Sequence, residues 1–145
     1  MLKVNDLMTK ELFTLSESDN LKMARSLMDL QRIRHIPIVN EEREFIGLIT
    51  HRDILRATIS QLADIDPETQ GEIDSGIPVG EIMRTDIKTI SEDTSLKDAA
   101  VALLDHKYGC FPVVNEKNGL IGILTEADFL KLTISLMDAL ENSDD

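Results

Sequence analysis

The sequence predicts a mixed α+β protein built from two gapless copies of one β-α-β-β-α unit, packed pseudo-symmetrically sheet to sheet with the helices outside. Three observations predict this fold class. The chain of 145 residues repeats itself, apolar residues change from helical to strand spacing in the same order in each copy, and a short Gly and Thr-x-x-Asp motif recurs at the same place in both copies.

The duplication is the first of these observations. A shift of 75 positions aligns residues 4–60 with 79–135 without a gap, and 20 of the 57 aligned pairs are identical. Chance does not give this at one fixed offset. We therefore expect a first repeat at 1–60, a linker at 61–78, a second repeat at 79–137 and an acidic tail at 138–145.

Each copy predicts the same elements in the same order. A short segment (13–15 and 88–90) leads into a helix with apolar residues at helical spacing. The apolar positions are Leu21, Ala24, Leu27 and Met28 in the first copy and Leu96, Ala99 and Leu103 in the second. Two strands follow, at 36–39 and 45–49 and at 111–114 and 120–124, and another helix begins at Thr50 and Thr125.

The segments outside the repeats are acidic. Residues 64–71 combine acidic and turn-forming residues, which predicts an exposed linker, and the last five residues predict a frayed tail. One copy of about 55 residues would bury only ~60% of its unfolded surface. We therefore expect the two copies to pack on each other and to form a cleft where their sheets meet.

Composition excludes several classes of function. A net charge of −12 with 3% aromatic residues is unfavourable for binding nucleic acid. Cys110 is the single cysteine, which favours a reducing, cytoplasmic compartment. No apolar run is long enough to span a membrane, and because the first residues lack the long apolar region of a signal peptide, we expect none. His35, His51 and His106 lack metal-ligand spacing, so no metal is expected.

The motif Gly47-Leu48-Ile49-Thr50-His51-Arg52-Asp53 recurs as Gly122-Ile123-Leu124-Thr125-Glu126-Ala127-Asp128. It leads from a strand into a helix N-terminus, whose free N–H groups attract phosphate. A threonine hydroxyl donates to phosphate, an aspartate accepts from both ribose hydroxyls, and the glycine permits close approach. The same pattern also fits a helix capping box, and the two interpretations are compatible.

These repeats and motifs resemble the cystathionine-β-synthase (CBS) family. The resemblance covers about residues 4–135. As a stand-alone pair of repeats, the chain is similar to the small CBS proteins labelled acetoin-utilisation-like. It implies a CBS pair, or Bateman module, without an attached effector domain, which commonly forms a homodimer. It also implies adenosyl ligands in the clefts: AMP, ADP or ATP, and less readily S-adenosylmethionine.

The resemblance also implies the ligand-binding residues. They are Thr50, Asp53, Arg52, Arg34, His35, Gly47 and Thr14 in the first copy, and Thr125, Asp128, Gly122 and Thr89 in the second. The second copy has Gly109 and Cys110 in place of Arg34 and His35, and Glu126 and Ala127 in place of His51 and Arg52. We therefore expect unequal clefts, of which the one built on Thr50 and Asp53 is the better polyphosphate site.

No P-loop, activated nucleophile or dinucleotide fingerprint is present, so we expect a non-catalytic sensor that reports an adenine nucleotide to an unidentified protein partner. The alternative is a ligand-free structural or dimerisation module. A nucleotide hydrolase is the third hypothesis, and it lacks a metal site and a base placed near phosphate.

Overall fold

A computed structural model describes residues 1–59, 66–106 and 109–143. The chain forms two compact units. One is Phe13–Ile87, and the other combines Met1–Leu12 with Lys88–Asp145. We call them the first-motif unit and the second-motif unit after the Thr-x-x-Asp motif that each contains. The unit boundaries differ from the repeat boundaries. The segments that open the two copies, residues 1–12 and 79–87, each belong to the unit that contains the rest of the other copy, and we call them the opening segments.

The first-motif unit is built around one hairpin. Its elements are α2 (Leu21–Gln31), β1 (His35–Val39), β2 (Phe45–Thr50), α3 (His51–Ile59), α4 (Pro67–Ser75) and the short 3-10 helix η1 (Val79–Glu81). Strands β1 and β2 pair antiparallel. Leu15 adds a parallel bridge to β1, and Arg84 adds an antiparallel bridge to β2. The hairpin is thus extended by one short segment on each side.

Helix α2 buries the face that its spacing predicts. Leu21, Ala24 and Met28 are each at most 4% exposed and pack with Ile36, Ile38 and Ile49 of the hairpin and with Ile54 and Val79. Asn20 begins the helix, because its side chain accepts from the Met23 N–H at 2.9 Å, which satisfies one of the free amides of the first turn.

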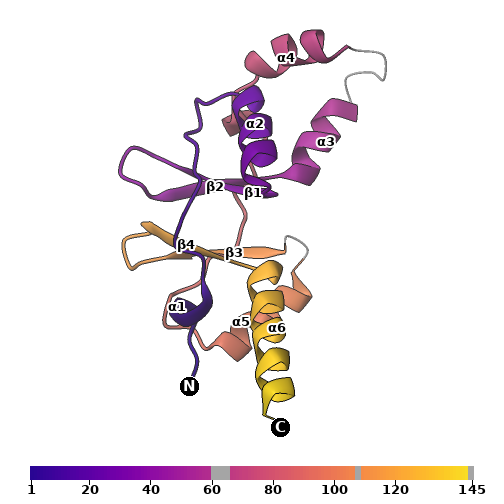
Figure 1. Ribbon diagram of the computed structural model, residues 1–145. Helices are drawn as coiled ribbons and strands as arrows, with labels where there is room; N and C mark the ends of the chain where they lie inside the picture. Colours follow the sequence, from indigo (N-terminus) through magenta and orange to yellow (C-terminus); the bar gives the residue numbers. More distant parts are fainter. Residues whose placement is uncertain (60–65, 107–108, 144–145) are drawn as a thin grey trace. The chain divides into compact units, whose positions relative to one another are not determined.

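The second-motif unit repeats this plan. Its elements are α1 (Val4–Leu7), α5 (Leu96–Asp105), β3 (Cys110–Val114), β4 (Leu120–Thr125) and α6 (Glu126–Asn142). Strands β3 and β4 pair antiparallel, Ile90 bridges to β3, and Thr9 bridges to β4. Figure 1 shows α1, the indigo helix, beside α5 and α6. The mixed α+β fold class is confirmed, and each copy has the predicted helix, two strands and helix in order, whereas the predicted first strand is a single bridge at Leu15 and at Ile90.

One asparagine builds the turn of each hairpin. The Asn115 side chain accepts from the N–H groups of Lys117 (3.0 Å) and Gly119 (2.8 Å). Asn40 does the same for Glu42 and Glu44 in the other unit. A side chain that holds the amides of its own turn explains why asparagine recurs at this position.

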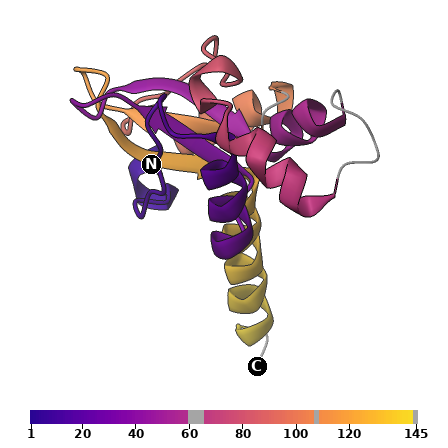
Figure 2. The same ribbon diagram turned by 90° about the horizontal axis from the view of Figure 1, so that it is seen from above.

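The segment predicted to be an exposed linker contains helix α4 at Pro67–Ser75, and residues 60–65 lie outside the described residues. Asp66 caps α4 by accepting from the Thr69 N–H at 2.7 Å, and Pro67 occupies its first turn, a favoured combination. Buried Asp74 accepts from Arg25 of α2 and from Gln70, and α4 lies beside α2 in both views (Figure 1, Figure 2). The predicted acidic tail is likewise helical as far as Asn142.

In each unit a methionine of the opening segment packs against a glycine of the hairpin. A Cβ on Gly47 would lie 2.5 Å from Met83 Sδ, and one on Gly122 would lie 2.6 Å from Met8 Sδ. The glycines therefore make room for methionine side chains from the other repeat. Met8 belongs to the core of its unit, and Met83 packs against the core of its own.

We predict that Gly47→Ala destabilises the protein by about 1–3 kcal/mol, because the added methyl overfills a packed site. Besides Met83, the new Cβ would lie 3.2 Å from the backbone oxygen of Arg84, so the methionine alone cannot relieve the contact. Urea unfolding of wild type and variant measures the change.

Gly71→Ala is the matched control. Gly71 lies inside α4, and a Cβ there would meet only the end of the Lys22 side chain at 3.9 Å. Alanine should raise helix stability there by about 0.5–1 kcal/mol. Equal stability of Gly47→Ala and wild type would contradict the close packing of Met83 on the hairpin.

Candidate functional site

The first Thr-x-x-Asp motif lies at the junction of β2 and α3. The Thr50 N–H donates to Asp53 Oδ2 at 3.0 Å, and the Asp53 N–H donates to Thr50 Oγ1 at 3.2 Å. This reciprocal pair is a capping box. Thr50 is 8% exposed and Asp53 is 7% exposed. The capping alternative considered from the sequence is therefore correct for this copy.

The second motif has a similar arrangement at the junction of β4 and α6. Asp128 Oδ2 accepts from the Thr125 N–H at 2.9 Å and from its hydroxyl at 3.3 Å. Asp128 is 5% exposed, whereas Thr125 is half-buried. Each motif thus positions a buried carboxylate above the first turn of a helix.

The second oxygen of each carboxylate binds the opening segment from the other repeat. Arg84 Nε donates to Asp53 Oδ1 at 2.9 Å, and Thr9 Oγ1 donates to Asp128 Oδ1 at 2.8 Å. Positions 9 and 84 are equivalent in the 75-residue repeat. Sequence reasoning missed both residues. The position directly after the identical Met8 and Met83 was the available signal.

The other predicted residues of the first motif surround the start of α3. The His51 N–H donates to the Arg34 backbone oxygen at 2.8 Å, which places these two residues together. Arg34 and Arg52 are exposed, and His35 is half-buried at the first position of β1. Gly47 was expected to permit close approach of a ligand, and in the structure the Met83 side chain lies against it.

The predicted residues of the second motif lie at the equivalent places. The Glu126 N–H donates to the Gly109 backbone oxygen at 3.2 Å, as His51 does to Arg34. Gly122 is covered by Met8. Thr14 and Thr89 are half-buried and directly precede Leu15 and Ile90, which form the parallel bridges to the hairpins.

The two motifs differ in charge. Around the first motif, four repeat-equivalent positions carry Arg34, His51, Arg52 and Arg84, and around the second they carry Gly109, Glu126, Ala127 and Thr9. These four positions therefore carry more basic side chains at the first motif than at the second.

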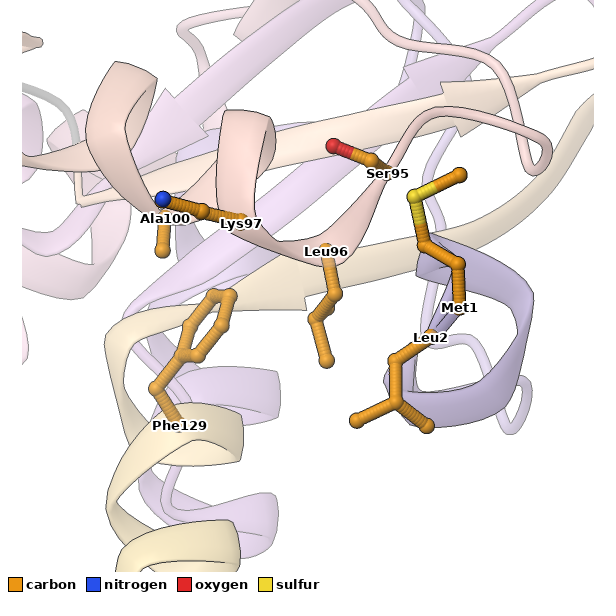
Figure 3. Close-up of a pocket in the computed structure, with 7 residues that line it drawn as sticks. All are labelled: Met1, Leu2, Ser95, Leu96, Lys97, Ala100 and Phe129. Carbon is orange, nitrogen blue, oxygen red and sulfur yellow. The ribbon is translucent and has the colours of Figure 1, made fainter.

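Other features of the described residues do not add to either motif. Figure 3 shows an apolar pocket in the second-motif unit, lined by Met1, Leu2, Ser95, Leu96, Lys97, Ala100 and Phe129, and no predicted site residue lines it. No cluster of three His, Cys, Asp or Glu side chains suited to a metal occurs in 1–59, 66–106 and 109–143. Within the same ranges, no helix has the length and apolarity needed to cross a membrane.

The family follows from a model that matches both repeats. The CBS domain model matches residues 4–60 and residues 79–135. The chain belongs to the CBS domain family. The family assignment made from the repeats and their motifs is confirmed.

Curated relatives include both small and large CBS proteins. A CBS domain-containing protein of Dictyostelium discoideum is 30% identical over 135 residues, which cover 93% of each chain. A homoserine O-acetyltransferase of Methanohalophilus mahii is 33% identical over 124 residues, 86% of this chain. The chain spans only 23% of that enzyme and 32% of an uncharacterized protein of Methanocaldococcus jannaschii.

Solved CBS structures share the fold over nearly the whole chain. An acetoin utilization protein (AcuB) from Vibrio cholerae has a TM-score of 0.82 and 34% identity, with 98% of this chain and 97% of that chain covered. CBSX2 in complex with AMP has a TM-score of 0.79 at 24% identity, covering 94% and 99%. A CBS domain pair in complex with 5′-methylthioadenosine and S-adenosyl-L-methionine has a TM-score of 0.77 at 24% identity, covering 93% and 98%.

We predict that Cys110, which faces Thr125 across the β3–β4 hairpin, is chemically inert in the folded protein. Burial raises the pKa of its thiol from 9.0 to about 12, so the reactive thiolate is absent near neutral pH. Labelling with a thiol reagent at pH 8 should be slow in buffer and rapid in denaturing urea.

The pH dependence has a definite sign. Above pH 9 the unfolded chain loses the thiol proton while the folded chain keeps it. Stability contributed by the protonated thiol is therefore present below pH 9 and is lost as the pH rises from 9 toward 12. Cys110→Ala should remove this part of the alkaline loss of stability, and equally fast labelling with and without urea would contradict the burial.

Proposed function

We propose that this chain is a non-catalytic sensor that binds an adenine nucleotide (AMP, ADP or ATP) at its two Thr-x-x-Asp motifs and reports it by a change of conformation or assembly. A ligand changes the conformation or assembly of a protein only if it binds one state more tightly than the other. The lone buried thiol of Cys110 supports a reducing cytoplasm as its compartment.

The motif carboxylates are the observation that carries the proposal. Each is almost fully buried at a helix N-terminus, and each is already oriented by a backbone N–H. A carboxylate offers about four acceptor positions, so Asp53 and Asp128 can cap their helices and still accept from ribose hydroxyls. The solved relatives bound to AMP or to S-adenosyl-L-methionine support an adenosyl ligand.

Charge supports unequal sites. Arg34, Arg52 and His51 surround the first motif and are the proposed phosphate ligands, together with Thr50 and, at the strand start, His35. Thr14 and Thr89 precede backbone groups that could meet an adenine edge. Thr125 and Asp128 are the proposed ligands of the second, less basic site, beside Gly122, which Met8 covers.

The enzyme activity of some relatives is not proposed for this chain. The homoserine O-acetyltransferase match covers only the CBS part of a much longer protein. A ligand-free dimerisation module is the alternative function, and the capping role of Asp53 and Asp128 favours it, because capping alone accounts for their burial.

We predict that AMP, ADP or ATP raises the melting temperature of the wild-type protein by several degrees. A ligand at 100 times its dissociation constant stabilises by about 2.7 kcal/mol. Asp53→Asn and Asp128→Asn should each weaken this shift, and the double variant should abolish it. Asparagine is chosen over alanine because it keeps an acceptor oxygen for the helix cap.

Asp98→Asn is the matched control. Asp98 lies at the third position of α5, where its N–H donates to the capping Ser95, and it belongs to neither motif. Its ligand shift should equal that of the wild type. If none of the nucleotides changes the melting temperature of the wild type, the ligand-free module is favoured. If the double variant keeps the wild-type increase in melting temperature, Asp53 and Asp128 are not the ribose ligands.

We also propose that the protein is a homodimer formed through α6. Leu130, Ile134 and Met137 follow each other at i, i+4 and i+7 and are more than half exposed in the single chain, as is Leu140. An apolar stripe of this kind on a surface helix commonly marks an interface.

Light scattering after gel filtration tests this assembly. Wild type should have twice the mass of one chain, and Leu130→Glu combined with Ile134→Glu should have the mass of one chain. Lys131→Glu, an exposed neighbour on the same helix, adds the same charge change outside the stripe and should remain dimeric. A dimer that survives the double variant would place the interface elsewhere.

A further inference from the structure

Positions 9 and 84 are the same position of the repeat, and they make the same backbone contacts. The Thr9 N–H and oxygen pair with Ile123 at 2.8 and 3.0 Å, and the Arg84 N–H and oxygen pair with Leu48 at 2.8 and 2.9 Å. Both residues are preceded by a methionine that covers the motif glycine. The same backbone pairing thus positions the Thr9 side chain at Asp128 and the Arg84 side chain at Asp53.

The side chains themselves differ in chemistry. Thr9 contributes one neutral hydroxyl to Asp128. Arg84 contributes a guanidinium to Asp53, 30% exposed beside a carboxylate that is 7% exposed. A guanidinium is a planar fork with five N–H donors, so one edge can bind a carboxylate while others face a second anion.

This difference matters at the place where a nucleoside would bind. If Asp53 holds ribose hydroxyls, the ligand binds the same carboxylate to which the Arg84 guanidinium donates, and we expect the guanidinium to lie near a phosphate attached to that ribose. Charge-assisted hydrogen bonds to phosphate are about twice as strong as neutral ones. Thr9 offers no such charge to a ligand on Asp128.

We infer that position 9/84 determines the ligand class of each site. Arg84 makes the Asp53 site select adenosyl ligands with a phosphate, and Thr9 leaves the Asp128 site open to adenosyl ligands without one. This inference rests on the proposed function, since it requires that both aspartates bind an adenosyl group.

A purely structural role is the alternative. The Arg84–Asp53 ion pair also joins the opening segment to the start of α3, and in that role it would affect all ligands equally. Thr at position 84 is a suitable test residue, because Thr9 already shows that threonine fits this backbone and reaches the aspartate.

The experiment compares AMP with adenosine by titration calorimetry in the full-length chain. An Asp128→Asn background leaves the Asp53 site, which should prefer AMP. Adding Arg84→Thr should lower the AMP-over-adenosine preference by about tenfold, the effect expected for one charged hydrogen bond. Arg84→Lys should keep most of the preference, because it retains the charge.

The reciprocal change uses an Asp53→Asn background, which leaves the Asp128 site. Adding Thr9→Arg there should raise the AMP-over-adenosine preference by about tenfold. An AMP preference that Arg84→Thr leaves unchanged, with both ligands weakened alike, would overturn the inference and leave the proposed function intact. Failure of both backgrounds to bind either compound would overturn the proposed function and this inference with it.

Discussion

The arrangement of each unit depends on one buried carboxylate. Asp53 and Asp128 each lie where a strand ends, a helix begins and an opening segment from the other repeat meets the hairpin. One oxygen fixes the helix start through a backbone N–H, and the other binds the side chain at position 84 or 9. Burying a charge is unfavourable unless its oxygens are paired, so these contacts are required for the fold regardless of any ligand. In the proposed function the same pairing would also orient the carboxylate for ribose hydroxyls, so that capping and ligand binding are compatible.

The two copies keep this arrangement while differing in charge. The backbone pairing of Thr9 with Ile123 matches that of Arg84 with Leu48, and Met8 and Met83 cover their glycines in the same way. Among the side chains that have diverged are those around the two motifs, where Arg34, His51, Arg52 and Arg84 of the first correspond to Gly109, Glu126, Ala127 and Thr9 of the second. A duplicated scaffold can therefore keep one geometry and hold two electrostatic environments, which is what a protein needs to distinguish related small molecules.

Much of this fold could be predicted from the sequence, because period and spacing report burial directly. Leu21, Ala24 and Met28 on α2 and Leu96, Ala99 and Leu103 on α5 are buried as their spacing predicts. Helix α4 was missed, because the acidic segment around Asp66 resembles a linker until Asp66 and Pro67 are recognised as a helix start. The exchange of opening segments could not be predicted, since Met8 and Met83 are identical, as are Gly47 and Gly122. Either methionine could cover either glycine, so the sequence does not show whether a methionine packs on its own copy or on the other. For the same reason the sequence did not show which aspartate Arg84 would contact.

The exchanged segments have a consequence for the order of synthesis on the ribosome. The first-motif unit is continuous from Phe13 to Ile87, so it can fold as soon as that stretch has emerged. Met1–Leu12 is made before its partners Ile123 and Asp128, which follow more than a hundred residues later. At 5–20 residues per second, the segment waits on the order of ten seconds. During that time Met8 and its apolar neighbours lack the residues that bury them in the folded unit, which leaves this segment open to chaperones or to pairing with a neighbouring nascent chain.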